Sequence, residues 1–218
     1  MTTEQTIVLH SEEELATGAR SAIYKLLAGA FAFPTETLVE SVAAGEFLRD
    51  MTSVGQHLPF APPLDAGARA AFADPSLTHD ELQQEYIRVF EVGAVRPLCP
   101  LYEGAHRAGR MKIMEELVRF YEHFGLQPHP ADRPDHLCAQ LEFMHFLCFK
   151  QAAAISSQGD VEGLALAQRD FLARHLCLWL PRLRKRLESC DGAPAFYLSL
   201  TRLAEGICRL DLAWLKGM

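Results

Sequence analysis

The stretch from Glu85 to Glu142 determines how this sequence is interpreted. It opens with Glu85-Tyr86-Ile87-Arg88-Val89-Phe90 and continues into the loop Arg96-Pro97-Leu98-Cys99-Pro100-Leu101-Tyr102-Glu103. A helical segment then closes at Phe124-Gly125, and Pro134-Asp135-His136-Leu137 leads into Leu141-Glu142-Phe143-Met144. Two proline-containing loops therefore bracket one helix, and most of the unusual sequence in the chain lies in or beside them.

The sequence on either side of this stretch predicts helices, with no convincing alternating strand. Ser11 to Glu14 and Thr78 to Glu81 each have the spacing of a capping box at the start of a helix. Apolar residues then recur at helical spacing, as Leu15, Ala19, Ile23, Leu26, Leu27 and Ala30 do before Pro34. The predicted helices cover 12–33, about 35–45 or with a kink to 51, 66–72, 79–90, 110–124, 136–156, 163–180 with an end or kink at Pro181, and 195–215.

Length and composition fit one all-α, single-domain helical bundle over residues 11–218, preceded by a flexible N-terminus at residues 1–10. A chain of 218 residues with 49% hydrophobic residues can bury one core, and it has no apolar run of membrane-spanning length. The first residues lack a secretory signal, which predicts a cytoplasmic protein. The net charge of −7 argues against a nucleic-acid partner, and six cysteines without a C-x-x-C pair indicate neither zinc nor a redox dithiol.

The motifs of the central stretch resemble those of the TorD/DmsD/NarJ family, in the family's order. Residues 85–90 match an E-Y-x-R-x-F helix, residues 97–103 a P-x-Y-E loop with an insertion at Cys99, and residues 135–144 a D-H-x-x-x-x-L-E-F-M helix. His175-Leu176 with Trp179 and Pro181 resembles the family's H-L-x-x-W-x-P. The likeness spans roughly residues 12 to 215. Gln140 departs from it, because the family often has an acid before L-E-F-M.

The resemblance implies a TorD-like bundle that acts as a cytoplasmic chaperone and not as an enzyme, without a cofactor of its own. Such chaperones bind the leader peptide and the apo form of the catalytic subunit of a DMSO-reductase-type molybdenum enzyme. They assist cofactor insertion and proofreading before twin-arginine export. The residues that the resemblance assigns to peptide binding are Asp135, His136, Glu142, Glu103, Tyr102, Arg88, Pro97 and Pro100. We expect Asp135, Glu103 and Glu142 to form an acidic surface that orients the leader's arginines.

Several of these residues also have a purely structural interpretation. Asp135 is a good N-cap for the helix that starts at His136. Tyr86, Val89 and Phe90 share an apolar face and are expected in the core. Arg88 could pair with Glu85 or Glu91, or brace the loop from Pro97 to Glu103. The basic run from Arg182 to Arg186 is expected on the solvated face of a helix.

The alternative function is a ferritin-like di-iron oxidoreductase, because Glu103 with His106 and Glu142 with His145 form two Glu-x-x-His pairs. On straight antiparallel helices these pairs would be out of register by more than about 10 Å, at ~1.5 Å per residue, so a shared metal is not expected. The sequence leaves open which molybdenum enzyme is the client and whether it is exported. It also leaves open a monomer or a dimer with helices exchanged at the connector from Gln127 to Pro134.

Overall fold

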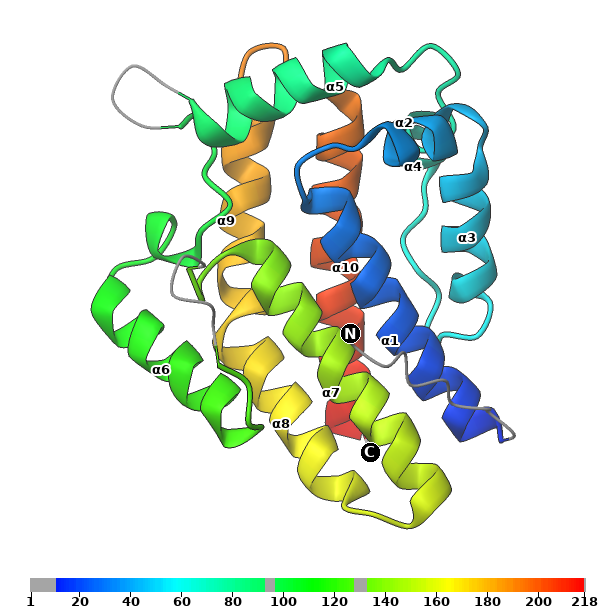
Figure 1. Ribbon diagram of the computed structural model, residues 1–218, viewed down its shortest axis with the longest axis vertical. Helices are drawn as coiled ribbons and strands as arrows, with labels where there is room; N and C mark the ends of the chain where they lie inside the picture. The colour runs from blue at the N-terminus through cyan, green and yellow to red at the C-terminus, as the bar shows by residue number, and fades with distance from the viewer. Residues whose placement is uncertain (1–10, 93–96, 128–132, 218) are drawn as a thin grey trace.

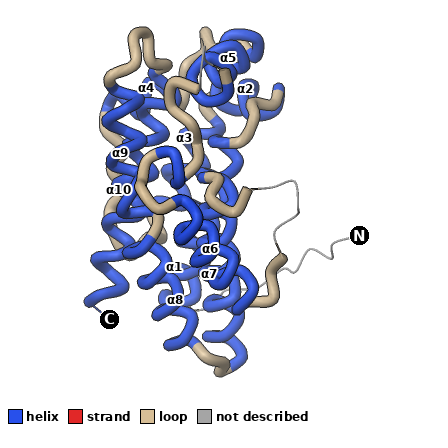
Figure 2. The backbone as a smooth tube through the Cα atoms, turned by 90° about the vertical axis from the view of Figure 1, so that its left-hand side faces the viewer, coloured by secondary structure: helices blue, strands red, loops and turns tan. Residues whose placement is uncertain are grey.

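The computed structural model describes residues 11–92, 97–127 and 133–217, and these ranges form helices without a strand (Figures 1 and 2). The predicted all-α class is therefore confirmed, whereas the predicted flexible segment 1–10 lies outside the described residues. The α-helices are α1 (Glu12–Phe31), α2 (Glu36–Ala43), α3 (Glu46–Gly55), α4 (Ala66–Ala71), α5 (His79–Tyr86), α6 (Arg110–His123), α7 (Leu137–Ser157), α8 (Val161–Arg174), α9 (Leu176–Glu188) and α10 (Ala195–Gly217). A π-helix, η1 (Ile87–Glu91), continues α5, and a short 3-10 helix, η2 (Glu103–Ala105), precedes α6.

The long helices α1, α7, α8, α9 and α10 form the body of the molecule. Helix α1 packs most extensively against α7, α8 lies against α7 and α10, and α9 lies against α10. In Figure 1, α5 crosses the upper end of this body, α2 to α4 lie on one side and α6 lies on the other. In the described ranges, no helix is both long and apolar enough to cross a membrane.

Local sequence signals account for the helix starts. The capping boxes of Ser11 with Glu14 and of Thr78 with Glu81 are both present. The stripe predicted for α1 is largely confirmed, because Ala19, Ile23, Leu27 and Ala30 are buried. Leu15, in the first turn of the helix, is an exception at 38% exposure. Helix α6 starts at Arg110 as predicted, directly after Gly109, whose φ of 83° is the left-handed conformation that glycine adopts without strain.

The helix predicted to end or kink at Pro181 breaks earlier, at His175, so that part of the prediction is wrong. His175 leaves helical geometry (φ −121°, ψ −91°) and separates α8 from α9, while Pro181 lies inside α9. A proline there removes one helix hydrogen bond. Burial of Trp179, Leu180 and Leu183 holds α9 helical in spite of this loss.

The segment E-Y-x-R-x-F contains the change from α5 to the π-helix η1. The Val92 amide donates to the Ile87 carbonyl (2.8 Å), and the Cys99 amide donates to the Val89 carbonyl (2.8 Å), which ties the following loop to η1. Tyr86, Val89 and Phe90 are buried, as predicted for core residues. The π-helix thus fixes where the loop leaves the bundle.

A fully buried ion pair joins the two ends of the described chain. The Arg20 Nε of α1 donates to Asp211 of α10 (2.6 Å), and the same guanidinium donates to Gln151 of α7 (3.2 Å) and Gln168 of α8 (2.5 Å). The Tyr24 hydroxyl also donates to Asp211 (2.8 Å). Burial and then the Asp211 carboxylate raise the pKa of Tyr24 well above its ordinary value, so Tyr24 remains a donor.

Candidate functional site

The motif segments, which are far apart in the sequence, meet at the carboxylate of Glu103. Glu103 opens η2 and is fully buried. Its carboxylate accepts from Gln140 Nε2 on α7 (2.7 Å) and lies 3.0 Å from His175 Nδ1 at the break between α8 and α9. Arg107 forms an ion pair with the same carboxylate. A loop, a helix and a helix break are therefore held by one buried anion.

Gln140 extends this cluster to α9. Its Oε1 accepts from Trp179 Nε1 (2.9 Å) while its amide nitrogen donates to Glu103. An ionised acid at position 140 could only accept, and it would stand beside the Glu103 carboxylate. The departure from the family pattern at Gln140 therefore fits its two partners in this chain. We name Glu103, Arg107, Gln140, His175 and Trp179 the Glu103 cluster.

His106 covers one side of the cluster. Its ring stacks on Trp179, with ring centroids 5.5 Å apart and an interplanar angle of 26°. Burial, and to a smaller extent Arg186 and Arg182, lowers the pKa of His106, despite the hydrogen bond to the Pro100 carbonyl (2.7 Å). A carbonyl only accepts, so Nε2 of the neutral ring carries the proton.

Asp135 is not the N-cap that the sequence predicts. His136 is the cap, with Nδ1 accepting from the Cys138 amide (3.2 Å). The buried Asp135 carboxylate instead accepts from the Gly104 amide (3.1 Å) and from Arg133 (2.8 Å). A Cβ on Gly104 would lie 3.0 Å from Asp135 Oδ2 and 2.9 Å from Arg110 Cγ, so the close approach of the loop to Asp135 favours glycine.

Residues 97–107 and 133–137 form a single unit, which we call the paired loops. Tyr102 and His136 form an isolated antiparallel bridge, their rings are in edge contact, and the Leu137 amide donates to the Leu101 carbonyl (2.8 Å). The Arg133 guanidinium lies 3.9 Å from the centre of the Tyr102 ring. The Tyr121 hydroxyl of α6 donates to the Pro134 carbonyl (2.9 Å), which attaches α6 to the same unit.

The structure brings together most of the predicted peptide-binding residues but orients them differently from the prediction. Glu103, Asp135 and Pro100 are buried, Tyr102, His136 and Pro97 are partly exposed, and Glu142 is exposed. The expected acidic surface is therefore wrong for Asp135 and Glu103, whose carboxylates are fully buried and paired with Arg133 and Arg107. They organise the loops from within.

Arg88 lies apart from this group. It pairs with Glu85 (2.5 Å), one of the two acids that the sequence indicates, and does not brace the loop. Its other contacts are hydrogen bonds to the carbonyls of Asp191 (3.3 Å) and Gly192 (2.6 Å). Arg88 therefore fastens η1 to the turn between α9 and α10.

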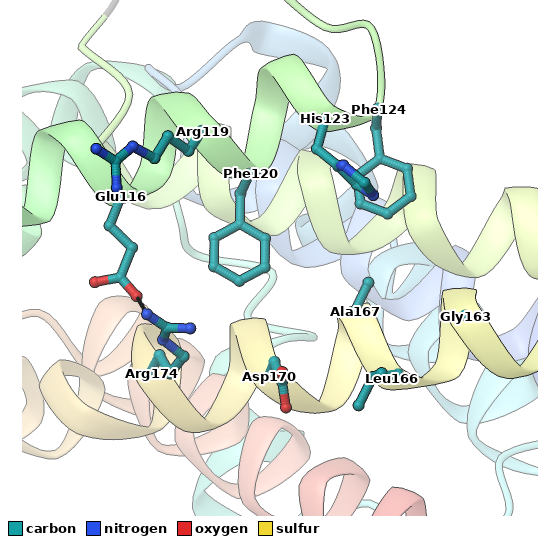
Figure 3. A pocket seen from close by; sticks show the side chains of 10 residues that line it. All are labelled: Glu116, Arg119, Phe120, His123, Phe124, Gly163, Leu166, Ala167, Asp170 and Arg174. Carbon is teal, nitrogen blue, oxygen red and sulfur yellow. Dashed lines mark ion pairs between the residues drawn. The ribbon is translucent and has the colours of Figure 1, made fainter.

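A groove of about 490 Å³ lies between α6 and α8 (Figure 3). Arg107 of the paired loops donates to the carbonyl of Arg174, which lines the groove (2.9 Å). In Figure 3 the Phe120 ring points from α6 towards α8, and Glu116 and Arg174 pair across one end. The Phe120 ring also meets the His175 ring edge-on, with centroids 5.7 Å apart, which connects the groove to the Glu103 cluster. The groove is lined by Glu116, Arg119, Phe120, His123, Phe124, Gly163, Leu166, Ala167, Asp170 and Arg174.

The two Glu-x-x-His pairs face different surroundings. His106 lies against the Pro100 carbonyl, whereas His145 Nδ1 contacts the Ser21 hydroxyl (2.7 Å) and the Ser21 carbonyl (3.1 Å) of α1. In the ranges that the structure covers, no three or more His, Cys, Asp or Glu side chains are placed to hold a metal ion. All six cysteines are free, and burial raises the pKa of Cys99, Cys138, Cys148 and Cys177 to about 12 each.

Sequence reasoning missed two parts of this site. It gave no role to Arg107 or Arg133, although their positions four residues after Glu103 and two before Asp135 could have indicated local ion pairs. It also missed the groove, because Phe120 and Leu166 look like ordinary apolar helix positions in the sequence. Leu166 is 47% exposed, which only the packing of α8 reveals.

Comparison with known proteins places the chain in a family. The family model described as nitrate reductase delta subunit matches residues 59–185. The selenate reductase assembly chaperone of Thauera selenatis is 46% identical over 142 residues, which are 61% of this chain and 74% of that protein. The perchlorate reductase assembly chaperone of Dechloromonas aromatica is 36% identical over 86% of this chain and 85% of that protein. The chain belongs to the TorD/DmsD/NarJ family of assembly chaperones.

Membership of this family agrees with the resemblance of the motifs. The dimethyl sulfide dehydrogenase assembly chaperone of Rhodovulum sulfidophilum, 33% identical, covers 95% of this chain and 86% of its own length. These relatives are named as assembly chaperones, and this TorD/DmsD/NarJ protein is a chaperone. The whole Glu103 cluster lies within the residues that the family model matches.

Proposed function

We propose that this chain is a cytoplasmic chaperone dedicated to one molybdenum-cofactor oxidoreductase of the DMSO-reductase type. It binds the leader peptide and the apo form of the catalytic subunit, and holds them until the cofactor is inserted and the subunit is released to twin-arginine export. Support comes from the relatives, which are named as assembly chaperones of selenate, chlorate and perchlorate reductases and of dimethyl sulfide dehydrogenase.

The observation that carries the proposal is the buried Glu103 cluster beneath the paired loops. Glu103 is fully buried and joins η2 to α7 and to the break before α9. A binding surface that is ordered before its ligand arrives loses less entropy on association. The cluster holds the loop that carries Tyr102, whose backbone forms a bridge with His136, and we assign these two side chains to contact with the leader.

The apolar part of the leader occupies the groove between α6 and α8. Burying roughly 400 Å² of apolar leader surface gives ~10 kcal/mol at 25 cal/mol/Å², against an association cost of ~4 to 15 kcal/mol. Exposed ion pairs give only about 0.2 to 1 kcal/mol each. Apolar burial must therefore hold the peptide, and the exposed Leu166 with Phe120 and Phe124 supplies the apolar floor.

The other predicted residues have supporting roles in this proposal. Pro97 in the paired loops and the exposed Glu142 on α7 flank the bound leader. Asp135, Glu103 and Pro100, which are buried, act by holding the loops in shape. Arg88 acts further away, by fastening η1 to the turn at Gly192.

The test is the variant Leu166→Glu, which places a carboxylate on the floor of the groove. We expect the affinity for the leader peptide, measured by titration calorimetry, to fall at least about tenfold, because a charge must be desolvated where apolar surface was buried. The unfolding free energy should change little, since Leu166 is already 47% exposed.

Leu178→Glu is the matched control. Leu178 is 45% exposed on α9 and does not line the groove, so this variant makes the same substitution at nearly the same exposure. Its leader affinity should stay within about twofold of the original chain. Equal losses of leader affinity in the two variants would exclude the groove as the leader's binding site. If the unmodified chain bound no leader measurably, the proposed function would be excluded.

A further inference from the structure

Helix α9 presents a basic surface directly beside the paired loops. Arg182 donates to the His106 carbonyl (2.9 Å), and Arg186, one turn later, donates to the Pro97 carbonyl (3.4 Å). Lys185 stands between them in sequence and is exposed. We call Arg182, Lys185 and Arg186 the α9 basic face. It flanks residues 97–107 at both ends of the loop.

The α9 basic face has no acidic counterpart among the described residues. Neither Arg182, Lys185 nor Arg186 forms an ion pair there, whereas Arg184 on the same helix pairs with Glu205 (2.5 Å) and Glu188 (2.7 Å). The carboxylates of Glu103 and Asp135, which are the nearest in the paired loops, are already paired with Arg107 and Arg133. Arg182 and Arg186 each donate one side-chain hydrogen bond to a loop carbonyl, and a guanidinium has five N–H donors in all.

The charge of the α9 basic face is opposite in sign to the net charge of the chain. The chain carries a net charge of −7, so a surface with three unneutralised cations runs against the overall charge. Burial lowers the pKa of the adjacent His106, and Arg186 and Arg182 lower it further. The loop beside α9 therefore lies in a local positive potential that favours an anionic ligand.

We propose that the α9 basic face binds an acidic segment of the client's catalytic subunit outside the leader. This inference rests on the proposed function for the existence of the client, and it adds a second contact. Arginine binds carboxylates with two parallel hydrogen bonds, and interfaces are enriched in arginine. The paired loops and the groove hold the leader, while α9 holds the body of the subunit.

Two contacts on one client account for binding of both a peptide and a folded protein. When the leader is engaged, the acidic segment meets α9 at a high effective concentration, so a weak second contact raises the overall affinity. The same second contact allows discrimination between clients whose leaders are alike. Charge across an interface acts mainly on specificity and association rate, and it makes binding sensitive to salt.

The experiment uses the full chain and two separate probes. One probe is the client leader fused to an unrelated carrier protein, and the other is the apo catalytic subunit without its leader. The client to use is the DMSO-reductase-type enzyme found among the reading frames that neighbour this chain's gene. For the double variant Arg182→Glu with Arg186→Glu, we expect binding of the leaderless subunit to fall at least about tenfold and to lose most of its salt dependence. Binding of the leader fusion should change less than about twofold.

A control variant changes the charge by the same amount elsewhere. Arg209→Glu with Lys216→Glu alters two exposed cations of α10 that form no ion pair within the described residues. This variant should bind both probes as the original chain does. Arg182→Lys with Arg186→Lys keeps the charge, and should retain most of the salt-dependent binding.

Each other outcome rejects the inference without touching the proposed function. If the original chain does not bind the leaderless subunit, there is no second contact. If the α9 and α10 variants lose equal affinity, the effect is one of net charge only. If the α9 variant loses as much affinity for the leader fusion as for the leaderless subunit, Arg182 and Arg186 serve only to hold the loop through its carbonyls. The proposed function fails only if the leader fusion does not bind the original chain.

Discussion

Two buried polar clusters in this chain use similar residues for different purposes. The cluster around Arg20 joins α1, α7, α8 and α10, and all of its members stand inside helices. The Glu103 cluster joins a 3-10 turn, α7 and the break at His175. Both contain a fully buried carboxylate, Asp211 in one and Glu103 in the other. The first cluster fixes helices to each other, and the second fixes loops to the helices.

The difference lies in what happens to the cation if the carboxylate is removed. Arg20 is completely enclosed, and its guanidinium has no path to water. Arg107 is 23% exposed and can turn outward. Loss of Asp211 therefore leaves a buried charge without a counter-ion, whereas loss of Glu103 mainly releases the loop. Loss of Asp211 should therefore lower the free energy of unfolding more than loss of Glu103 does. Loss of Glu103 should lower the affinity for the leader more than loss of Asp211 does.

Asp211→Asn should give the largest effect on stability. The substitution keeps the shape of the side chain but leaves the buried Arg20 charge unpaired, which costs about 3 to 5 kcal/mol. The unfolding free energy from urea denaturation should fall by that amount. The leader affinity of the protein that remains folded should stay within about twofold, because no residue of this cluster belongs to the paired loops or lines the groove.

The double variant Arg20→Met with Asp211→Leu is the control for that explanation. It removes both charges and replaces them with apolar side chains, which often recovers the stability lost by breaking a buried pair. We expect it to be more stable than Asp211→Asn alone. A double variant less stable than the single one would mean that the hydrogen bonds to Gln151, Gln168 and Tyr24, and not the unpaired charge, dominate.

Glu103→Gln makes the corresponding change in the other cluster. We expect a smaller loss of unfolding free energy, about 1 to 3 kcal/mol, because Arg107 can be hydrated and the hydrogen bond from Gln140 is weakened but not abolished. Leader affinity should fall more than in Asp211→Asn, by roughly tenfold, since the paired loops lose their anchor. Hydrogen exchange at residues 101–106 should rise in this variant only. Unchanged exchange there would show that the cluster does not hold the loops.

Local features of this chain could be predicted from residue spacing, whereas the partners within the two buried clusters could not. The starts of α1, α5 and α6 follow from capping boxes and from Gly109, which act within a few residues. The order of the motifs was enough to group Tyr102, Asp135 and His136. By contrast, Arg20 and Asp211 are 191 residues apart, and Glu103 and His175 are 72 apart. Nothing in local spacing indicates such partners.

Contacts between residues far apart in the sequence also explain the two clearest errors of the sequence prediction, at Pro181 and at Asp135. Pro181 is a strong local signal for the end of a helix, yet the chain breaks at His175, whose ring contacts the buried Glu103. Asp135 is a favourable N-cap by local rules, yet its carboxylate binds the Gly104 amide 31 residues away. In both cases a tertiary contact outweighs a local preference worth about 1 to 3 kcal/mol.

The smallest expected effect concerns His106 and His145, one near each cluster. Burial lowers the pKa of both rings, so the unfolded chain binds protons more readily than the folded chain. The contribution of these neutral rings to the free energy of unfolding is therefore fully present above the ordinary histidine pKa, and it is lost as the pH drops below that value. His106→Gln keeps a donor for the Pro100 carbonyl but cannot titrate. The unfolding free energy of this variant, measured from pH 8 to pH 5, should fall less than that of the original chain.

His145→Gln should reduce the pH dependence of the unfolding free energy in the same way. His145 of α7 contacts Ser21 of α1, and burial lowers the pKa of its ring. The two variants should differ in the pH dependence of leader binding. Of the two histidines only His106 belongs to the paired loops, where it contacts the Pro100 carbonyl and stacks on Trp179 of the Glu103 cluster. Calorimetric affinities from pH 8 to pH 5 should thus vary less with pH in His106→Gln than in His145→Gln. Identical affinity profiles would mean that His106 supports the fold alone, as the Arg20 cluster does.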